Sequence, residues 1–352
     1  MPVEPESTVG RRYAVAASGI GSNKRASGSG TQGFWRTVIR AKAGRFVRPL
    51  RDHAAVMLLI LLLVAGGSLS DVFFTPQNLL NILWAVSVLG IVALGQTMLL
   101  ITCNFDMSVA CVVGLSGIVT VVSQVAGLGL VGSISAGLLS GFAIGFLNGI
   151  LVVATKANPF LITLGSNSLA YAIALTITHS RTLYTTIPTF NILGRGRLFG
   201  VIHYSALIFL VLALILEFVL RRTTFGRSLF ILGLNATAGR LSGLNMQRTR
   251  LIAFILCGVL AALAGMIMTA RIGSTVASAG FGMEFDSIVA AVLGGTSLFG
   301  GRGGALRTVV GVTVLGVINN LMILLDVPFE SQQIAKGVVF LFVVWMDSLL
   351  RR

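Results

Sequence analysis

The chain has 352 residues, of which 55% are hydrophobic and 11% are charged, and its formal net charge is +15. Soluble domains carry about 25% charged residues, so this composition indicates an integral membrane protein and excludes an ordinary soluble enzyme. A pI near 11.3 would also suit a nucleic-acid-binding protein. However, the basic residues lie in the breaks between apolar runs, as in a membrane protein. We therefore expect contact with lipid and no nucleic-acid partner.

The first region is a basic tail over residues 1–53. Its first 33 residues are rich in Ser, Gly and Ala and lack an apolar period, which predicts disorder. Residues 34–51 place a few aromatic and aliphatic side chains at helical spacing among basic ones, so this part is either an interfacial helix on anionic lipid or a basic linker. We expect a largely disordered cytoplasmic tail and no cleavable signal, because the first apolar run starts only at Ala54.

Apolar runs fill the rest of the chain, from 54 to 350. A bilayer core of about 30 Å requires about 20 helical residues, and only helices or closed barrels satisfy the backbone there. The sequence therefore predicts an all-α polytopic membrane protein with about ten transmembrane helices, although the eighth run is short. The runs cover 54–70, 79–101, 108–126, 130–155, 159–178, 204–220, 251–270, 286–299, 304–325 and 333–350.

The distribution of charge gives the orientation. Cytoplasmic loops are enriched in Lys and Arg. If the N-terminus is cytoplasmic, 21 of the 26 basic residues lie in inner segments and five in outer ones. This division predicts that both termini are cytoplasmic and that the number of spans is even.

Polar residues interrupt the sequence between the second and third runs. Asn104, Phe105, Asp106 and Ser108 stand there between two apolar segments. Asp106 or Ser108 suits the cap of a helix that begins at the third run. Alternatively, the segment is a broken helix at the wall of a translocation pathway, where polar groups face water. Both interpretations stay open, and the four residues are candidates for the pathway.

Three residues at the start of the fifth run are further pathway candidates. Pro159 suits the first turn of a helix, Asn158 its cap, and Phe160 follows them. The other charge inside a run, Glu217, stands one turn from Arg221. This spacing favours an ion pair within one helix over a role in transport.

Glycine is frequent, with 42 residues, and marks two segments. In the fourth run, glycines from 132 to 149 recur near one face, which predicts close helix packing. The segment 291–307 carries a dense set of glycines on the predicted inner side, which permits left-handed backbone and close approach. The longest outer break, 180–203, contains proline and scattered apolar residues, which predicts an ordered cap.

No motif indicates catalysis. The three histidines stand at or beyond the ends of runs, no Walker loop occurs, and the three cysteines have no metal-ligand or disulfide spacing. We therefore expect no enzyme activity, no metal and no directly bound cofactor.

Several motifs in order resemble the membrane permease of ribose-type ABC sugar importers, from about residue 54 to the end. They are ALGQTMLLITCNFDMSVACVVGLSG (93–117), NPFLITLGS (158–166), TTFGRSLFILGLNATAGRLSGLN (223–245), GGTSLFGGRGGALRTVVGVTVLGVINN (294–320) and SQQIAKGVV (331–339). The resemblance implies a type II ABC-importer-like permease of a bacterial inner membrane. Its expected partners are an ATPase that hydrolyses ATP, an extracytoplasmic solute-binding protein and a second permease subunit.

The resemblance also gives a role to the basic island 221–250, which carries six arginines and no acid. It implies a cytoplasmic coupling segment whose short helix sits in a groove of the ATPase. Small residues would make that helix slim, and spaced apolar residues would anchor it. The alternative is a basic loop that only sets topology. The matching residues are Gly233, Asn235, Ala236, Gly239, Arg240, Leu241, Ser242 and Gly243.

Two segments depart from the family pattern. The family usually has Gly-Gly-Ile-Asp-Leu-Ser where this chain has Cys103 to Ser108, and an acidic position of the coupling segment is occupied here by Ala236 or Thr237. These departures put pathway geometry and ATPase pairing in question. The expected function is a pathway subunit for a monosaccharide or related small polar solute. An ion-coupled carrier or channel that works without an ATPase is the alternative.

Overall fold

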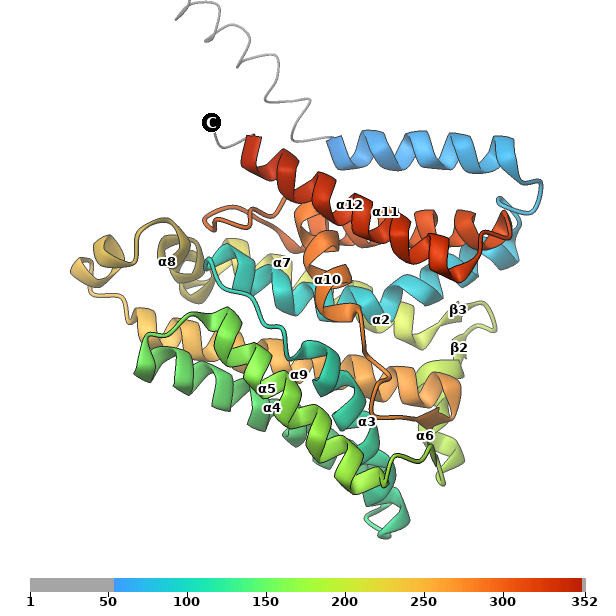
Figure 1. Ribbon diagram of the computed structural model, residues 1–352, viewed down its shortest axis with the longest axis horizontal. Helices are drawn as coiled ribbons and strands as arrows, with labels where there is room; N and C mark the ends of the chain where they lie inside the picture. Colours follow the sequence, from blue (N-terminus) through green and yellow to red (C-terminus); the bar gives the residue numbers. More distant parts are fainter. Residues whose placement is uncertain (1–53, 350–352) are drawn as a thin grey trace, which may run out of the picture. The chain divides into compact units, whose positions relative to one another are not determined.

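The computed structural model describes residues 54–349, and helices dominate it (Figure 1). Residues 1–53, where the basic tail is predicted, lie outside the described residues. The helices are Ala54–Leu69, α2 (Pro76–Ile101), α3 (Val109–Val125), α4 (Gly129–Thr155), α5 (Pro159–Thr178), α6 (Pro188–Arg195), α7 (Tyr204–Arg222), α8 (Thr224–Leu241), α9 (Met246–Ile272), α10 (Met283–Leu293), α11 (Ala305–Leu324) and α12 (Phe329–Leu349).

Side-chain caps define where several of these helices begin. Thr75 accepts a hydrogen bond from the Asn78 backbone N–H, and Pro76 follows it. At α5 the Asn158 Oδ1 accepts from the Phe160 N–H at 3.0 Å, with Pro159 in the first turn. Such caps satisfy donors that have no partner within the helix. The starts of α2 and α5 thus have a local physical cause, and the cap that the sequence assigns to Asn158 is confirmed.

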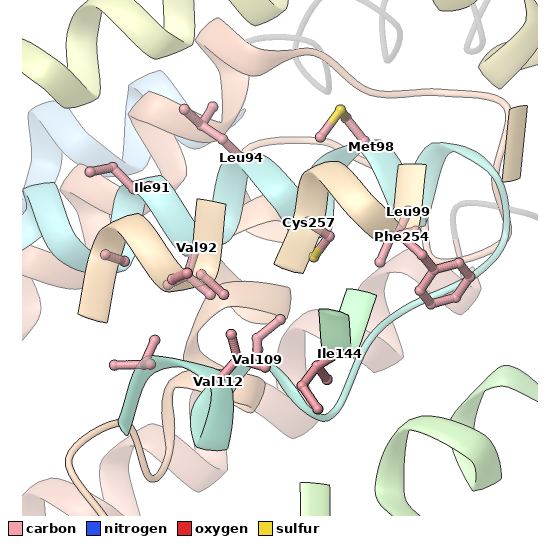
Figure 2. Close-up of a cluster of buried hydrophobic side chains, with 14 of the residues drawn as sticks. Ile91, Val92, Leu94, Met98, Leu99, Val109, Val112, Ile144, Phe254 and Cys257 are labelled. Carbon is pink, nitrogen blue, oxygen red and sulfur yellow. The ribbon is translucent and has the colours of Figure 1, made fainter. Parts of the chain in front are cut away.

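The core is built around α2 and α9. Figure 2 shows Val92, Leu94 and Leu99 of α2 together with side chains of α3, α4 and α9. Phe254 and Cys257 of α9 lie in the same cluster and are almost fully buried. Between helices in a membrane, close van der Waals packing of such side chains is a favourable term, and this packing centres on α2 and α9.

Glycines let α4 and α9 approach closely. A Cβ on Gly141 would lie 2.3 Å from the Gly258 carbonyl oxygen, and one on Gly145 would lie 2.6 Å from the Phe254 carbonyl oxygen. Neither position has room for a side chain. The packing role predicted for the glycines of the fourth run is therefore confirmed at this contact.

Six helices within residues 54–349 are long and apolar enough to cross a membrane, namely α2, α4, α5, α7, α9 and α11. The all-α polytopic prediction is confirmed, whereas the count of ten crossings is not. The run 286–299 shows the reason. Its helix, α10, has 11 residues and ends at Leu293, with Gly294 as the C-cap, and Gly295 then takes a left-handed conformation (φ 99°). An 11-residue helix spans about 16 Å, roughly half of a bilayer core.

The segment 180–203 is ordered, as the sequence predicts. It holds α6 and the short strands β1 (Leu183–Tyr184), β2 (Arg197–Leu198) and β3 (Ile202–His203). β1 pairs antiparallel with β4 (Ser274–Thr275), which follows α9, and β2 pairs antiparallel with β3. The first pairing ties the segment to the end of α9. α6 and α8 lie at opposite ends of α9 (Figure 1).

Candidate functional site

The basic island folds mainly as α8, which the structure divides at Asn235. The Asn235 backbone leaves the helical region (φ −161°, ψ 92°). Its side-chain Oδ1 accepts hydrogen bonds from the backbone N–H groups of Thr237 at 3.1 Å and Ala238 at 3.0 Å. These are the bonds of an N-cap. Asn235 therefore starts a second, short helix that ends at Leu241.

This short helix presents an apolar and basic surface. Leu241 is 86% exposed, and Leu234, just before the cap, is 71% exposed. Arg240 and Ser242 are exposed beside them, whereas Gly239 is buried against Met246 and Ile231. The side of the helix that carries Gly239 therefore packs against the rest of the chain, and Leu241 is exposed.

The remaining predicted coupling residues lie on either side of the cap. Gly233 and Ala236 are half-buried, and Gly243 takes a left-handed turn (φ 78°) that leads into α9. All the predicted coupling residues fall within the continuous stretch 233–243, and their coupling role stays a prediction. We refer to Gly233–Gly243 as the coupling surface.

The predicted pathway residues of the α2–α3 loop are mostly buried. Asp106 is 1% exposed and Ser108 is 0% exposed. The Asp106 Oδ1 accepts hydrogen bonds from the Ser108 backbone N–H at 2.8 Å and from its hydroxyl at 2.6 Å. The side chain of Ser108 forms no cap bond of its own. Asp106 therefore supplies the acceptor at the start of α3, as the cap interpretation expects.

Asp106 also connects several helices. The Asn148 Nδ2 of α4 donates to the Ser108 hydroxyl at 2.9 Å and to the Asp106 Oδ2 at 3.3 Å. The Gln96 side chain of α2 bonds both backbone groups of Asp106. The Met107 N–H donates to the Thr163 hydroxyl of α5 at 3.0 Å. One short loop thus joins α2, α3, α4 and α5 through polar contacts. We refer to these bonds as the Asp106 network.

Other pathway candidates lie beside this network. The Phe105 and Phe160 rings contact each other, with centroids 5.9 Å apart. Asn104 is 3% exposed, and its side-chain amide donates to Thr102, so it closes the turn locally. The fold therefore brings together Phe105 with Phe160 and Asp106 with Ser108. Asn158 caps α5, and Pro159 stands in its first turn.

Sequence reasoning missed Asn148, Gln96 and Thr163 as partners of Asp106. Asn148 carries a signal, because it is a strongly polar residue in the apolar run of α4 and is fully buried. A buried amide requires hydrogen-bond partners. The sequence alone does not show where those partners lie.

Glu217 forms the predicted ion pair with Arg221, one turn along α7. The structure adds a second partner, because the Glu217 Oε2 accepts from the Leu306 N–H at 3.2 Å. Leu306 stands in the first turn of α11, where a carboxylate is favourable for the helix dipole. Glu217 thus ties α7 to α11, and its local role is confirmed.

The end of the bundle that holds α6 carries a cluster that the sequence does not reveal. The Trp84 ring of α2 stacks on His203, with centroids 4.5 Å apart, and the Arg271 guanidinium lies 3.5 Å from the Trp84 centroid. The Arg197 Nε donates to the His203 Nε2 at 3.2 Å. Burial, and after it the charges of Arg197 and Arg271, lower the pKa of His203. The histidine is therefore the neutral acceptor in this cluster.

An open apolar cavity of about 480 Å³ lies next to α6. It is lined by Leu130, Ile134, Thr189, Phe190, Ile192, Leu193, Tyr204, Leu207 and Ile208. None of these is a predicted pathway or coupling residue. Within the described residues, no group of three or more His, Cys, Asp or Glu side chains is placed to hold a metal ion.

The chain matches known transport proteins over most of its length. Residues 78–344 match the family model for the permease component of the branched-chain amino acid transport system. The ribose import permease protein of Escherichia coli (strain K12) is 36% identical over 308 residues, which cover 85% of this chain and 94% of that protein. The D-allose transport system permease protein of the same strain is 33% identical over 302 residues, covering 85% and 92%.

A third relative is the autoinducer 2 import system permease protein of Escherichia coli (strain SMS-3-5). It is 32% identical over 307 residues, which cover 87% of this chain and 90% of that protein. No solved structure matches the chain. The match to the family model covers well over half of the 352 residues. The chain therefore belongs to this family of transport-system permeases, which are multi-pass membrane subunits that work with a separate ATPase and a solute-binding protein and are not themselves catalytic.

Proposed function

We propose that the chain is the permease subunit of an ATP-driven ABC importer and forms the pathway for a monosaccharide or a related small polar solute. Relatives named for ribose and D-allose import are 33–36% identical and nearly equal in length, which supports this solute class. The chain binds no ATP directly, and hydrolysis belongs to the partner ATPase.

The observation that carries this proposal is the coupling surface. A short capped helix projects from the end of the bundle and exposes Leu241 beside Arg240. An exposed apolar side chain on a short helix suits the helix-in-groove mode of recognition. Within the described residues the surface contains no acidic side chain. An ATPase groove with apolar and acidic lining would fit it.

The orientation and the assembly complete the proposal. The distribution of basic residues, 21 against five, supports a cytoplasmic position for the coupling surface and for both termini. On this arrangement α6 and the Trp84 cluster face outward, where an extracytoplasmic binding protein delivers the solute. A second copy of the permease completes the pathway in the bacterial inner membrane, with lipid around both.

Within the pathway we assign the Asp106 network the role of a packing switch. ATP-driven displacement of the coupling surface would favour one of two packings of the spans. The Asp106 network joins four helices by a few directional hydrogen bonds. These bonds would break and form again when the helices shift. The Phe105–Phe160 contact lies next to it.

The first experiment tests the coupling surface with Leu241→Asp. The complex is reconstituted with its ATPase and binding protein, and co-purification of the ATPase and solute-stimulated ATP hydrolysis are measured. We expect both to fall at least about tenfold, because a charge replaces an apolar anchor. Phe199→Asp is the matched control, since Phe199 is 92% exposed at the opposite end, and the ATPase should still co-purify with it. Unchanged hydrolysis and binding in Leu241→Asp would refute the coupling surface.

The second experiment tests Asp106 with Asn. This substitution replaces the carboxyl group by an amide but keeps an oxygen that can accept from Ser108, so the complex should still assemble. We expect uptake of D-ribose to fall, because one of the two oxygens near Asn148 becomes a donor. Asp71→Asn is the control, since Asp71 is exposed. Normal uptake in Asp106→Asn would leave the residue only its role at the start of α3.

The alternative function, an ion-coupled carrier or channel, predicts a different result. Uptake that persists without ATP but collapses with the ion gradient would establish an ion-coupled carrier. Concentration of solute by vesicles that contain this subunit alone would overturn the importer proposal.

A further inference from the structure

Three backbone segments that are far apart in the sequence meet beside the coupling surface. They are Gly233 of α8, the end of α2 at Ile101, and the glycine-rich loop before α11. A Cβ on Gly233 would lie 1.9 Å from the Ile101 carbonyl oxygen and 2.7 Å from the Gly301 backbone nitrogen. The Gly301 N–H donates to the same Ile101 oxygen at 2.8 Å. In Figure 1 the loop before α11 reaches the side of α8.

The contact requires glycine on both sides. Gly300 and Gly301 take left-handed conformations, with φ of 79° and 73°. A Cβ on Gly300 would lie 3.1 Å from the Cys103 Cβ and 3.1 Å from the Gly233 Cα. The Leu234 side chain covers Gly301, because a Cβ there would lie 2.4 Å from the Leu234 Cδ2. Backbone therefore packs directly on backbone between Gly233, Ile101 and Gly301.

The position of this contact links the two parts of the site. Gly233 stands two residues before the Asn235 cap, where the coupling surface begins. On the other side, Ile101 and Cys103 lead directly into Asn104 and Asp106. Only a few residues therefore separate the short helix from the Asp106 network, so a displacement of the helix can reach the network through this contact. Close-packed backbone contacts transmit such a displacement because they do not compress.

We propose that Gly233, Gly300 and Gly301 form a rigid joint that passes movement of the coupling surface to the α2–α3 loop. The three glycines are positioning residues for ATP-driven transport, since they act through the loop and do not contact ATP or solute. This inference rests on the proposed importer function and deepens it. The joint moves as one body, so α8, the loop before α11 and the end of α2 keep their mutual contact throughout the cycle.

The main test is Gly233→Ala in the complete complex, reconstituted in vesicles. The measured quantity is the amount of D-ribose imported per ATP hydrolysed. The added methyl group forces Gly233 away from Ile101, so we expect this ratio to fall at least about fivefold, with ATP still hydrolysed. A ratio equal to that of the unmodified complex would overturn the joint.

Two matched glycine substitutions separate coupling from stability. Gly258→Ala creates a similar clash, 2.3 Å from the Gly141 carbonyl oxygen, at the remote α4–α9 contact. It should lower uptake and hydrolysis together and leave their ratio unchanged. Gly337→Ala in α12 meets no atom within 4 Å and should change neither. A ratio that falls as much in Gly258→Ala as in Gly233→Ala would show a general packing defect and would count against the joint.

A cross-link tests the joint even if Gly233→Ala does not fold. Cys103 is a free, exposed thiol, so Gly300→Cys places a second thiol beside it. The Cβ separation is within a few tenths of an ångström of the range that a disulfide needs. The variant is oxidised, the bond is verified by mass, and D-ribose uptake is compared before and after reduction. The oxidised control Gly300→Cys with Cys103→Ser cannot form the bond.

A rigid joint predicts that the oxidised complex transports as well as the reduced one, because the two segments never separate. Loss of uptake on oxidation, with recovery on reduction, would show that they slide and would overturn the proposal. If the bond does not form, the strain of a cysteine at the left-handed Gly300 explains the result, and the ratio measured for Gly233→Ala decides. If the unmodified complex imports D-ribose without ATP, the proposed function fails and the joint is not the cause.

Discussion

Two short helices at opposite ends of α9 are held in opposite ways. α6 is tied to spanning helices by long-range bonds. Trp84 donates to the Gly194 carbonyl at 3.0 Å, and the Arg195 Nε donates to the Arg271 carbonyl at 2.8 Å. Phe190 of α6 is buried at 1% exposure. α6 is thus part of the same packed body as α2 and α9.

The short helix after Asn235 lacks comparable ties. Its side-chain hydrogen bonds are local, from Asn235 to Thr237 and Ala238 and from Ser242 to Ala238. Leu241 contributes an exposed side chain, and Gly239 makes the close packing contact, against Met246 and Ile231. The difference teaches that the α6 end is firmly packed, and we call it the platform. The short helix from Asn235 to Leu241 is held by local bonds and is largely exposed, and we call it the handle.

The largest expected effect on the platform comes from Trp84→Ala. It removes the bond to Gly194, the stacking on His203 and the contact with Arg271. We expect the free energy of unfolding to fall by about 3 kcal/mol, measured by thermal unfolding in detergent. Trp345→Ala in α12 is the matched control, since Trp345 is 59% exposed, and its effect should stay below about 1 kcal/mol. Equal losses in the two variants would remove the distinction that defines the platform.

A smaller loss of stability is expected from Gln124→Leu. The Gln124 Oε1 of α3 accepts from the Thr186 N–H at 3.0 Å and from the Ile187 N–H at 3.4 Å, just before α6. Leaving these donors without a partner should cost about 2 kcal/mol. Gln77→Leu on the exposed start of α2 should cost much less. Unchanged thermal unfolding in Gln124→Leu would show that α6 does not depend on this tie.

On the handle, Asn235→Ala should act locally. Loss of a cap costs about 1 kcal/mol, so amide protection of residues 236–241 against hydrogen exchange should fall about fivefold while global unfolding stays unchanged. Asn245→Ala is the matched control, because Asn245 caps α9 by accepting from the Arg248 N–H at 2.9 Å. That variant should lower global stability. A global loss in Asn235→Ala would mean that the handle is as firmly packed as the platform.

The smallest expected effect is a pH dependence of the platform. Burial and the charges of Arg197 and Arg271 lower the pKa of His203 below its ordinary value of 6.5. The unfolded chain therefore binds more protons than the folded one below that pH, and the contribution of His203 is complete above pH 6.5 and is lost as the pH falls toward the folded pKa. Thermal unfolding between pH 7.5 and 5 should show this decline. It should persist in His179→Gln and flatten in His203→Gln, and an equal decline in both variants would contradict it.

Much of the site was predictable where the cause is local. The caps at Asn158 and Asp106, the Glu217–Arg221 pair and the packing of the α4 glycines follow from residue types at short spacing. The family motifs also predicted a coupling segment at 221–250, and its coupling role stays a prediction. Position within the fold was not predictable, because Asn148 and Asp106 are 42 residues apart and meet only when α4 packs beside α3.

The sequence by itself determined that this protein is a bundle of apolar helices, with a polar break at 102–108 and a basic island at 221–250, because hydrophobic runs and capping residues act over a few positions. Only the tertiary structure decided that Gly233, Ile101 and Gly301 touch, and that the Trp84 ring contacts both His203 and Arg271. Such contacts join segments separated by many residues, and they are fixed by how whole helices pack, which no local pattern encodes.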